Sequence, residues 1–220
     1  MDTSVARRNI LARIRAAQGR SAESAASERE AVADYLARHP EGPRPPMPDD
    51  LVARFVDEAR KMSTTVEEVA TLSDVPAAAH RYLLERELPV QAVAWETLRE
   101  LAWADAGIAV EFRKPGNLDP VGITGCFCAT AETGTLVLLS GPQTYSSAGL
   151  LPETHIAIVP ASRIVAGQED AFSLIRAERG ELPRAVNFVS GPSRTGDIEQ
   201  TIVLGAHGPY RVHAIVVRGA

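Results

Sequence analysis

The residues best suited to chemistry lie in the segment 190–199, SGPSRTGDIE. An apolar, strand-like run ends where this segment begins, and the polar turn is predicted to open a helix with Ser193, Arg194 and Asp197 at its start. The first N–H groups of a helix lack intrahelical partners and favour negative charge, and the guanidinium of Arg194 adds a planar pair of donors. These features predict a site for a small carboxylate or phosphate ligand. The alternative is an ordinary capped turn, in which Arg194 pairs with an acid of the same segment.

Three further segments place polar residues beside glycines at the ends of predicted strands. They are residues 122–125 (GITG), 131–135 (AETGT) and 204–209 (LGAHGP). Because ligands of open α/β sheets bind at strand ends, we expect these segments and SGPSRT to converge around one cleft. Thr124 and Thr133 are the further candidate ligand-binding residues of this cleft.

Glu132 and His207 are the candidate catalytic residues. A carboxylate at Glu132 suits a general base, a nucleophile or a metal ligand, but it equally suits a structural acceptor for the turn around it. His207 lies between two glycines on a predicted loop, where an imidazole can transfer protons near neutral pH. His155 and His213 lie in predicted strands and are expected in the core. The histidines lack the HxH or HxxxH spacing of a metal site, so no metal is predicted.

Composition limits the classes of function. The 220 residues suffice for one substantial α/β domain, and a net charge of −5 argues against nucleic acid as the main partner. No apolar run approaches the ~20 residues of a membrane span, so we expect a cytoplasmic protein. The two cysteines, Cys126 and Cys128, are fewer than the four thiolates of an iron–sulfur cluster. We therefore expect free thiols and no cofactor in this chain.

The chain divides into an N-terminal helical arm and a larger domain. Helices are predicted over residues 3–18 and 27–38, and a proline-rich linker follows up to residue 48. Residues 49–220 are predicted to form the α/β domain.

Helices and strands alternate along this domain. Helices are predicted over residues 51–62, 74–87, 96–104 and 169–178. Strands are predicted over residues 64–70, 89–94, 108–112, 136–139, 156–159, 186–189, 202–204 and 214–217. Alternation of this kind, with continuous apolar runs as strands, predicts a mainly parallel sheet with helices on both faces.

Five segments, in this order, resemble the LUD-domain family and in particular its lactate-utilisation C type. They are GITG, AETGTLVL, LLPETHIAIVP with SRIV, VNFVSGPSRTGDIE, and LGAHGPYRVH. The resemblance is dense from about residue 121 to 217. It implies an α/β core similar to that of sugar-phosphate isomerases, CoA-transferases and formyltetrahydrofolate cyclo-ligases.

The resemblance also implies a role in oxidising lactate to pyruvate beside partner proteins that carry iron–sulfur clusters. In that hypothesis Arg194 and the amides around Ser193 hold the carboxylate of a small anionic metabolite, with Glu132 and His207 near the reacting carbon. Two alternatives remain open. One is a stand-alone acyl or CoA transferase, or a cyclo-ligase-like enzyme, with Glu132 as nucleophile by fold analogy alone. The other is a non-catalytic regulatory or assembly subunit.

Overall fold

The computed structural model describes residues 3–20, 26–198 and 201–220 and contains two units, which we treat separately. The arm, Met1–Pro43, contains the helices α1 (Ser4–Ala17) and α2 (Ala26–Arg38), close to the predicted bounds. The core unit is Arg44–Ala220. It begins before residue 49 because the guanidinium of Arg44 binds the carboxylate of Asp170 at 2.7 Å.

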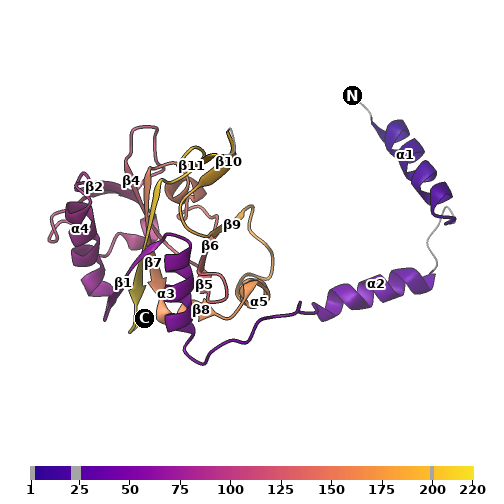
Figure 1. Cartoon of the computed structure of the whole chain (residues 1–220), viewed down its shortest axis with the longest axis horizontal. Coiled ribbons are helices and arrows are strands. Elements are labelled where there is room, and N and C mark those ends of the chain that lie inside the picture. Colours follow the sequence, from indigo (N-terminus) through magenta and orange to yellow (C-terminus); the bar gives the residue numbers. More distant parts are fainter. Residues whose placement is uncertain (1–2, 21–25, 199–200) are drawn as a thin grey trace. The chain divides into compact units, whose positions relative to one another are not determined.

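The centre of the core unit is a six-stranded sheet whose hydrogen-bonded pairs are parallel (Figure 1). The strand order is β1-β12-β7-β4-β2-β3. The predicted parallel sheet is thus confirmed. Its strands are β1 (Thr65–Val69), β2 (Gln91–Ala94), β3 (Ala109–Glu111), β4 (Val121–Gly125), β7 (Thr154–Pro160) and β12 (Arg211–Val217).

Helices cover both faces of this sheet. Along β7, Ile156 and Ile158 pack in the apolar cluster that contains α4, whereas Ala157 and Val159 pack in the cluster that contains α3. Successive side chains of a strand point to opposite faces, so the two helices lie on opposite sides. This burial on both faces explains the continuous apolar runs of the strands. The helices of the core unit are α3 (Leu51–Lys61), α4 (Val75–Glu85) and α5 (Gln168–Arg179).

A second, four-stranded sheet lies on the α3 side, in the order β8-β5-β6-β9. The predicted strands at residues 136–139 and 186–189 exist, but they belong to this sheet and run antiparallel to each other. The short turn after β5 reverses the chain, so that β6 cannot join the parallel sheet. The face of the four-stranded sheet that points away from α3 is covered by α5. Its strands are β5 (Cys128–Thr130), β6 (Thr135–Leu139), β8 (Ile164–Val165) and β9 (Val186–Val189).

The helix predicted over residues 96–104 is wrong. The structure has a single 3₁₀ turn there, η2 (Glu96–Leu98). The indole of Trp103 is buried, and its Nε1 donates a hydrogen bond of 2.9 Å to the carbonyl of Leu98. Burial of this large side chain turns the chain back and overrides local helix propensity. The other 3₁₀ turns are η1 (Leu72–Asp74), η3 (Ser146–Gly149) and η4 (Ala161–Arg163).

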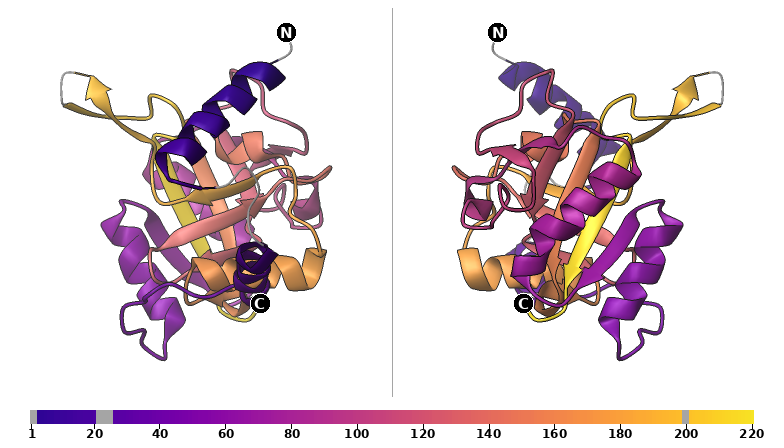
Figure 2. Two further views of the ribbon diagram at one scale, coloured as in Figure 1. Left: turned by 90° about the vertical axis from the view of Figure 1, so that its right-hand side faces the viewer. Right: turned by 90° about the vertical axis from the view of Figure 1, so that its left-hand side faces the viewer.

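The helix predicted after Ser193 is also wrong. Residues there form an antiparallel hairpin of β10 (Arg194–Ile198) and β11 (Thr201–Leu204), which projects from the core unit (Figure 2). β-branched residues and Gly196 favour a strand over a helix. Ser193, Arg194 and Asp197 therefore do not lie at a helix N-terminus, and the run 202–204 is not part of the central sheet. Glu199 lies outside the described residues.

Candidate functional site

Two of the predicted segments meet where the parallel strands begin. The loop of residues 205–209 leads into β12, whose first residue, Arg211, pairs with Thr154 at the start of β7. The backbone N–H of Ser193 donates to the carbonyl of Pro209 at 2.9 Å, and that of Gly205 donates to the carbonyl of Ser193 at 2.9 Å. SGPSRT and GAHGP therefore lie side by side at the amino ends of the strands.

The Arg194 side chain binds the turn between α3 and β1. Its Nη2 donates to the carbonyl of Met62 at 3.1 Å and to Oγ of Ser63 at 2.7 Å. The described partners of Arg194 are thus a carbonyl and a hydroxyl. This geometry fits a clamp between the hairpin base and the α3–β1 turn. His207 is exposed in the neighbouring loop, and the side chain of Asp197 lies outside the described residues.

A chain of hydroxyl groups joins AETGT to the SGPSRT segment. Thr130 Oγ1 lies 3.0 Å from Thr133 Oγ1, which lies 2.7 Å from Thr135 Oγ1, and this in turn lies 2.6 Å from Ser190 Oγ. Thr130 and Thr135 are buried, whereas Thr133 and Ser190 are exposed. These hydroxyl contacts connect the β5–β6 turn to the end of β9.

Glu132 and Thr124 face other surroundings. Oε2 of the half-buried Glu132 lies 3.1 Å from the position that a Cβ on Gly167 would occupy, and the guanidinium of Arg44 approaches the same glycine. Glu132 therefore points to the start of α5. Thr124 is buried within the sheet, where its Oγ1 hydrogen-bonds Nε2 of His155 at 2.8 Å. GITG thus does not bring an exposed side chain to the amino-end segments.

Both strand histidines are core residues, as the sequence predicts. Burial lowers the pKa of His155 to about 4. Burial, with the nearby charge of Arg86, lowers the pKa of His213 to about 4. His213 stacks on Tyr82 with a centroid separation of 3.9 Å. Both imidazoles are therefore neutral at pH 7.

A cleft of about 850 Å³ opens at the other end of the sheet, beyond the carboxyl ends of β4 and β7. The seven residues of β7, at about 3.3 Å each, separate it by roughly 20 Å from the amino-end segments. Open parallel sheets bind ligands at this edge. The residues that line the cleft include Trp95, Gly125, Cys126, Phe127, Ser140, Gln143, Thr144, Pro160, Arg163, Glu178, Arg179 and Glu181.

Of the four predicted segments, GITG contributes Gly125 to the wall of this cleft, but none of the candidate catalytic or ligand-binding side chains is among its lining residues. A usable signal was the Gly-Pro turn at residues 141–142, which follows the apolar run that forms β6 after one serine. Turn residues after a buried strand indicate a strand end, and therefore a candidate ligand site, as clearly as the four segments selected from the sequence.

The charges of the cleft are partly paired. Arg163 donates from Nε to the carbonyl of Phe127 at 2.8 Å and from both Nη atoms to the carboxylate of Glu178 at 2.5 and 3.0 Å. The guanidinium holds the pKa of Glu178 below its usual range. Arg179 lies with its guanidinium 5.8 Å from the Phe127 ring centroid. The described contacts give Arg179 no ion pair, so it is the cleft cation best able to meet an anionic ligand.

The two cysteines are free thiols. Burial raises the pKa of Cys128 to about 11 and raises that of Cys126, on the cleft wall, still further. Both thiols are therefore protonated at neutral pH, which suits neither a nucleophile nor a thiolate ligand. Among the described residues, no group of three or more His, Cys, Asp or Glu is placed to hold a metal ion.

The fold and the cleft define a two-sheet α/β protein with a ligand-sized opening beyond the carboxyl ends of its parallel strands. The LUD domain profile matches residues 52–217, and the chain therefore belongs to the LUD-domain family. No helix in the described part of the chain combines the length and apolar character needed to cross a membrane.

Relatives and a solved structure agree with this assignment. The chain is 38% identical over 139 residues to "Lactate utilization protein C" of Bacillus subtilis, covering 61% of this chain and 55% of that protein. It is 30% identical over 192 residues to the Bacillus velezensis protein of the same name, covering 77% and 78%. With "Lactate utilization protein C 1" of Bacillus mycoides it shares 45% identity over 111 residues, covering 49% and 46%. The match thus spans about half the length of two of these three relatives.

A crystal structure of a DUF162 family protein from Deinococcus radiodurans has the same fold. The TM-score is 0.60 at 21% identity, and the match covers 79% of this chain and all of that one.

Proposed function

We propose that this chain is the C-type component of a lactate-utilising system and that it binds a small organic acid in the carboxyl-end cleft. The observation that carries the proposal is the LUD match over residues 52–217, together with relatives named for lactate utilisation. In this assignment the protein works in the cytoplasm.

The cleft supplies groups that suit an organic acid. Arg179 offers a cation to the carboxylate, and a charge-assisted bond to a guanidinium is stronger than one between neutral groups. Trp95 and Phe127 give the apolar walls that are common in small-molecule sites. The Arg163–Glu178 pair neutralises itself, which leaves Arg179 as the cation for the ligand, with Glu181 as a further acid of the wall.

Oxidation of lactate to pyruvate releases two electrons and two protons, and the electrons need an acceptor. Two cysteines with raised pKa values do not provide the four thiolates of an iron–sulfur cluster. We therefore assign the electron carriers to iron–sulfur partner proteins. This chain would hold the acid or organise the complex.

A second candidate site for the same ligand is the amino-end group of Ser193, Arg194 and His207. These segments lie together, although the helix expected to orient them is absent. The acyl-transferase alternative would need Glu132 as nucleophile at the ligand. The position of Glu132 does not favour this, because its side chain faces Gly167 and Arg44 rather than the cleft.

The test has two parts. Deletion of the gene should abolish growth on lactate as sole carbon source while growth on glucose remains normal. Calorimetric titration of the purified protein with lactate and pyruvate should show saturable binding, with inorganic phosphate as the comparison anion. Normal growth of the deletion strain on lactate would overturn the role, and the absence of binding of either acid would overturn the ligand.

A further inference from the structure

The α4 side of the central sheet carries polar side chains at the amino ends of its strands. In the sheet register Thr65 of β1 lies beside His213 of β12, and Arg211 of β12 lies beside Thr154 of β7. The imidazole of His213 stacks on Tyr82 of α4, and strand residues two apart point to the same face. Polar groups thus gather at this end of a face that is otherwise apolar.

Two of these side chains are buried and have a polar atom without a partner. Thr154 is 0% exposed and His213 is 3% exposed. Neither Oγ1 of Thr154 nor Nε2 of His213 has a hydrogen-bond partner among the described residues. By strand geometry the two Cα atoms are about 8 Å apart, a distance that one small molecule can bridge. Buried polar groups are nearly always hydrogen-bonded, so the two atoms indicate a molecule bound beside them.

The hydrogen bond of the other ring nitrogen makes His213 a suitable donor. Its Nδ1 lies 2.9 Å from Oγ1 of Thr65. When Nδ1 accepts from this hydroxyl, Nε2 carries the hydrogen of the neutral imidazole. The unpartnered Nε2 then donates, and the hydroxyl of Thr154 can donate as well. Both groups therefore suit the oxygen atoms of a ligand.

Two arginines lie next to these donors. The guanidinium of Arg86 is 5.9 Å from the ring centroid of Tyr82, whose ring stacks on His213. Arg211 is the register neighbour of Thr154. Burial raises the pKa of Tyr82, and the charges of Arg86 and Arg211 oppose that rise. Both cations thus lie within electrostatic reach of the same ring.

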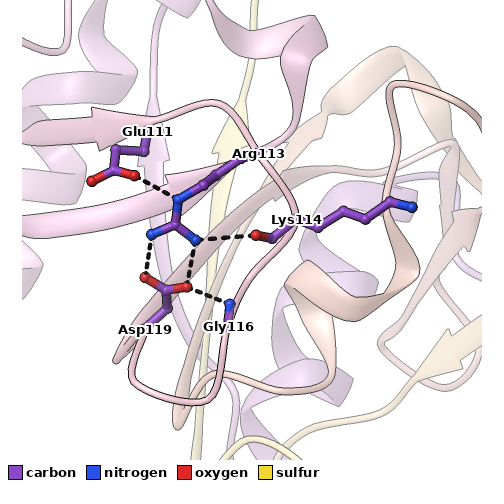
Figure 3. A network of polar contacts seen from close by, with 5 residues as sticks. All are labelled: Glu111, Arg113, Lys114, Gly116 and Asp119. Atoms are coloured by element: carbon purple, nitrogen blue, oxygen red, sulfur yellow. Dashed lines mark hydrogen bonds and ion pairs between the residues drawn. The ribbon is translucent and has the colours of Figure 1, made fainter.

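These two arginines differ from Arg113, which acids hold in place (Figure 3). Arg113 binds both carboxylate oxygens of Asp119 at 2.7 and 2.8 Å, and its Nε binds Glu111 at 2.5 Å. In the described part of the chain, neither Arg86 nor Arg211 forms an ion pair. Their guanidinium donors are therefore available to an anion from solution.

The acids of the surrounding segments do not neutralise this pair of cations. Glu67, on the same face of β1, is paired with Arg81. Three further acids nearby in the sequence are exposed: Glu85, Glu87 and Glu153. None of the three is among the groups that shift the pKa of Tyr82 or His213, and the charges that do so are arginines.

We propose that Arg86, Arg211, Thr154 and His213 form a binding site for a phosphate group at the amino ends of β7 and β12. The guanidinium groups supply charge-assisted bonds, and the imidazole and the hydroxyl donate to further oxygens. Donors on several elements match the four oxygens of a phosphate better than the two of a carboxylate. The site is separate from the carboxyl-end cleft and does not depend on the proposed function.

The test is calorimetric titration of the full-length protein with inorganic phosphate at constant ionic strength. Arg86→Gln and Arg211→Gln should each weaken binding by about 10- to 150-fold, the range for a hydrogen bond to a charged group. The matched control is Arg184→Gln, an exposed arginine before β9, which should bind within about twofold of wild type. Acetate should bind more weakly than phosphate.

Nuclear magnetic resonance of ¹⁵N-labelled protein follows the imidazole directly. Phosphate should shift the Nε2 resonance of His213 and leave the ring resonances of the buried His155 unchanged. His213→Phe keeps a ring against Tyr82 without the donor, so it should weaken phosphate binding while circular dichroism shows a folded chain.

Three results would overturn the site. One is a wild-type chain that shows no saturable phosphate binding, or that binds acetate as tightly. Another is equal phosphate binding by wild type and the double variant Arg86→Gln/Arg211→Gln, or a His213 Nε2 resonance that phosphate does not shift. The third is loss of phosphate binding in Arg179→Gln with full binding in the double variant, which would place the anion in the cleft.

Discussion

At the carboxyl ends of β4 and β7 the chain leaves a cleft walled by aromatic rings, a turn and two arginines. At the amino ends of the same strands the loops close on one another through backbone bonds and expose apolar side chains to solvent. The first end is concave and suits a small molecule. The second is closed by backbone–backbone hydrogen bonds between its loops.

This difference shows that a group of polar residues beside glycines does not by itself mark a ligand site. At the amino end such residues join chain segments: Arg194 holds the α3–β1 turn, and the threonines from Thr130 to Thr135 reach Ser190. The glycines there allow close backbone approach. Four predictions test the contrast between the two ends.

The largest expected effect is on stability at the amino end. Gly134 has φ +62°, and a Cβ there would collide with the backbone of Ala59. Gly134→Ala should lower the free energy of unfolding by about 3 kcal/mol or more, because strain and overpacking add. The matched control is Gly180→Ala, at φ +72° with no described atom within 4 Å, which should cost about 1 kcal/mol. Urea unfolding measures both, and equal losses would contradict a close backbone contact at Gly134.

The next effect concerns ligand binding in the cleft. Arg179→Gln should weaken binding of the organic acid by about 10- to 150-fold, the equivalent of about 1.5–3 kcal/mol for a charge-assisted bond. Arg179→Lys should recover part of this loss, since an ammonium keeps the charge without the planar fork. Calorimetric titration provides the measurement. Arg194→Gln is the matched variant at the amino end. A larger loss of affinity for Arg194→Gln than for Arg179→Gln would show that the ligand binds at the amino end.

The third effect is a dependence of stability on pH. The pKa values of His155 and His213 are about 4 in the folded chain and about 6.5 when unfolded. Below pH 6.5 the unfolded chain takes up protons first, so stability falls as the pH decreases towards 4. Between pH 7 and 5 each histidine should account for about 2 kcal/mol. His213→Phe, which keeps a ring against Tyr82, should remove about half of that decline in urea unfolding. An unchanged decline would show that other groups cause it.

The smallest effect is expected for Arg194→Ala on stability. The side chain is exposed, and its described partners are a carbonyl and a hydroxyl of the α3–β1 turn. Loss of such surface contacts should change the free energy of unfolding by about 1 kcal/mol or less. Thermal unfolding provides the measurement. A loss of several kcal/mol would show that Arg194 is a principal clamp of the hairpin base.

Local sequence determined most elements of the fold. Asp50 caps α3 by accepting from the N–H of Ala53 at 2.9 Å, and Phe55 and Ala59 on one helix face are buried as their spacing predicts. The apolar runs of β7 and β12 predicted a parallel sheet covered on both sides, and the segments of the LUD resemblance predicted the family. Each of these features depends on residues close together in the chain, which is why the sequence alone was sufficient.

Tertiary structure decided which segments share a sheet and which end of the sheet is open. β6 and β9 are as apolar as β7, yet a turn that reverses the chain places them in a second sheet. The residues after Ser193 form a hairpin in place of a helix. The carboxyl-end cleft combines Trp95, Phe127 and Arg179 from distant parts of the chain, so no short pattern specified it. Pairing and cavity shape depend on contacts between such distant segments, and local propensity and spacing do not encode them.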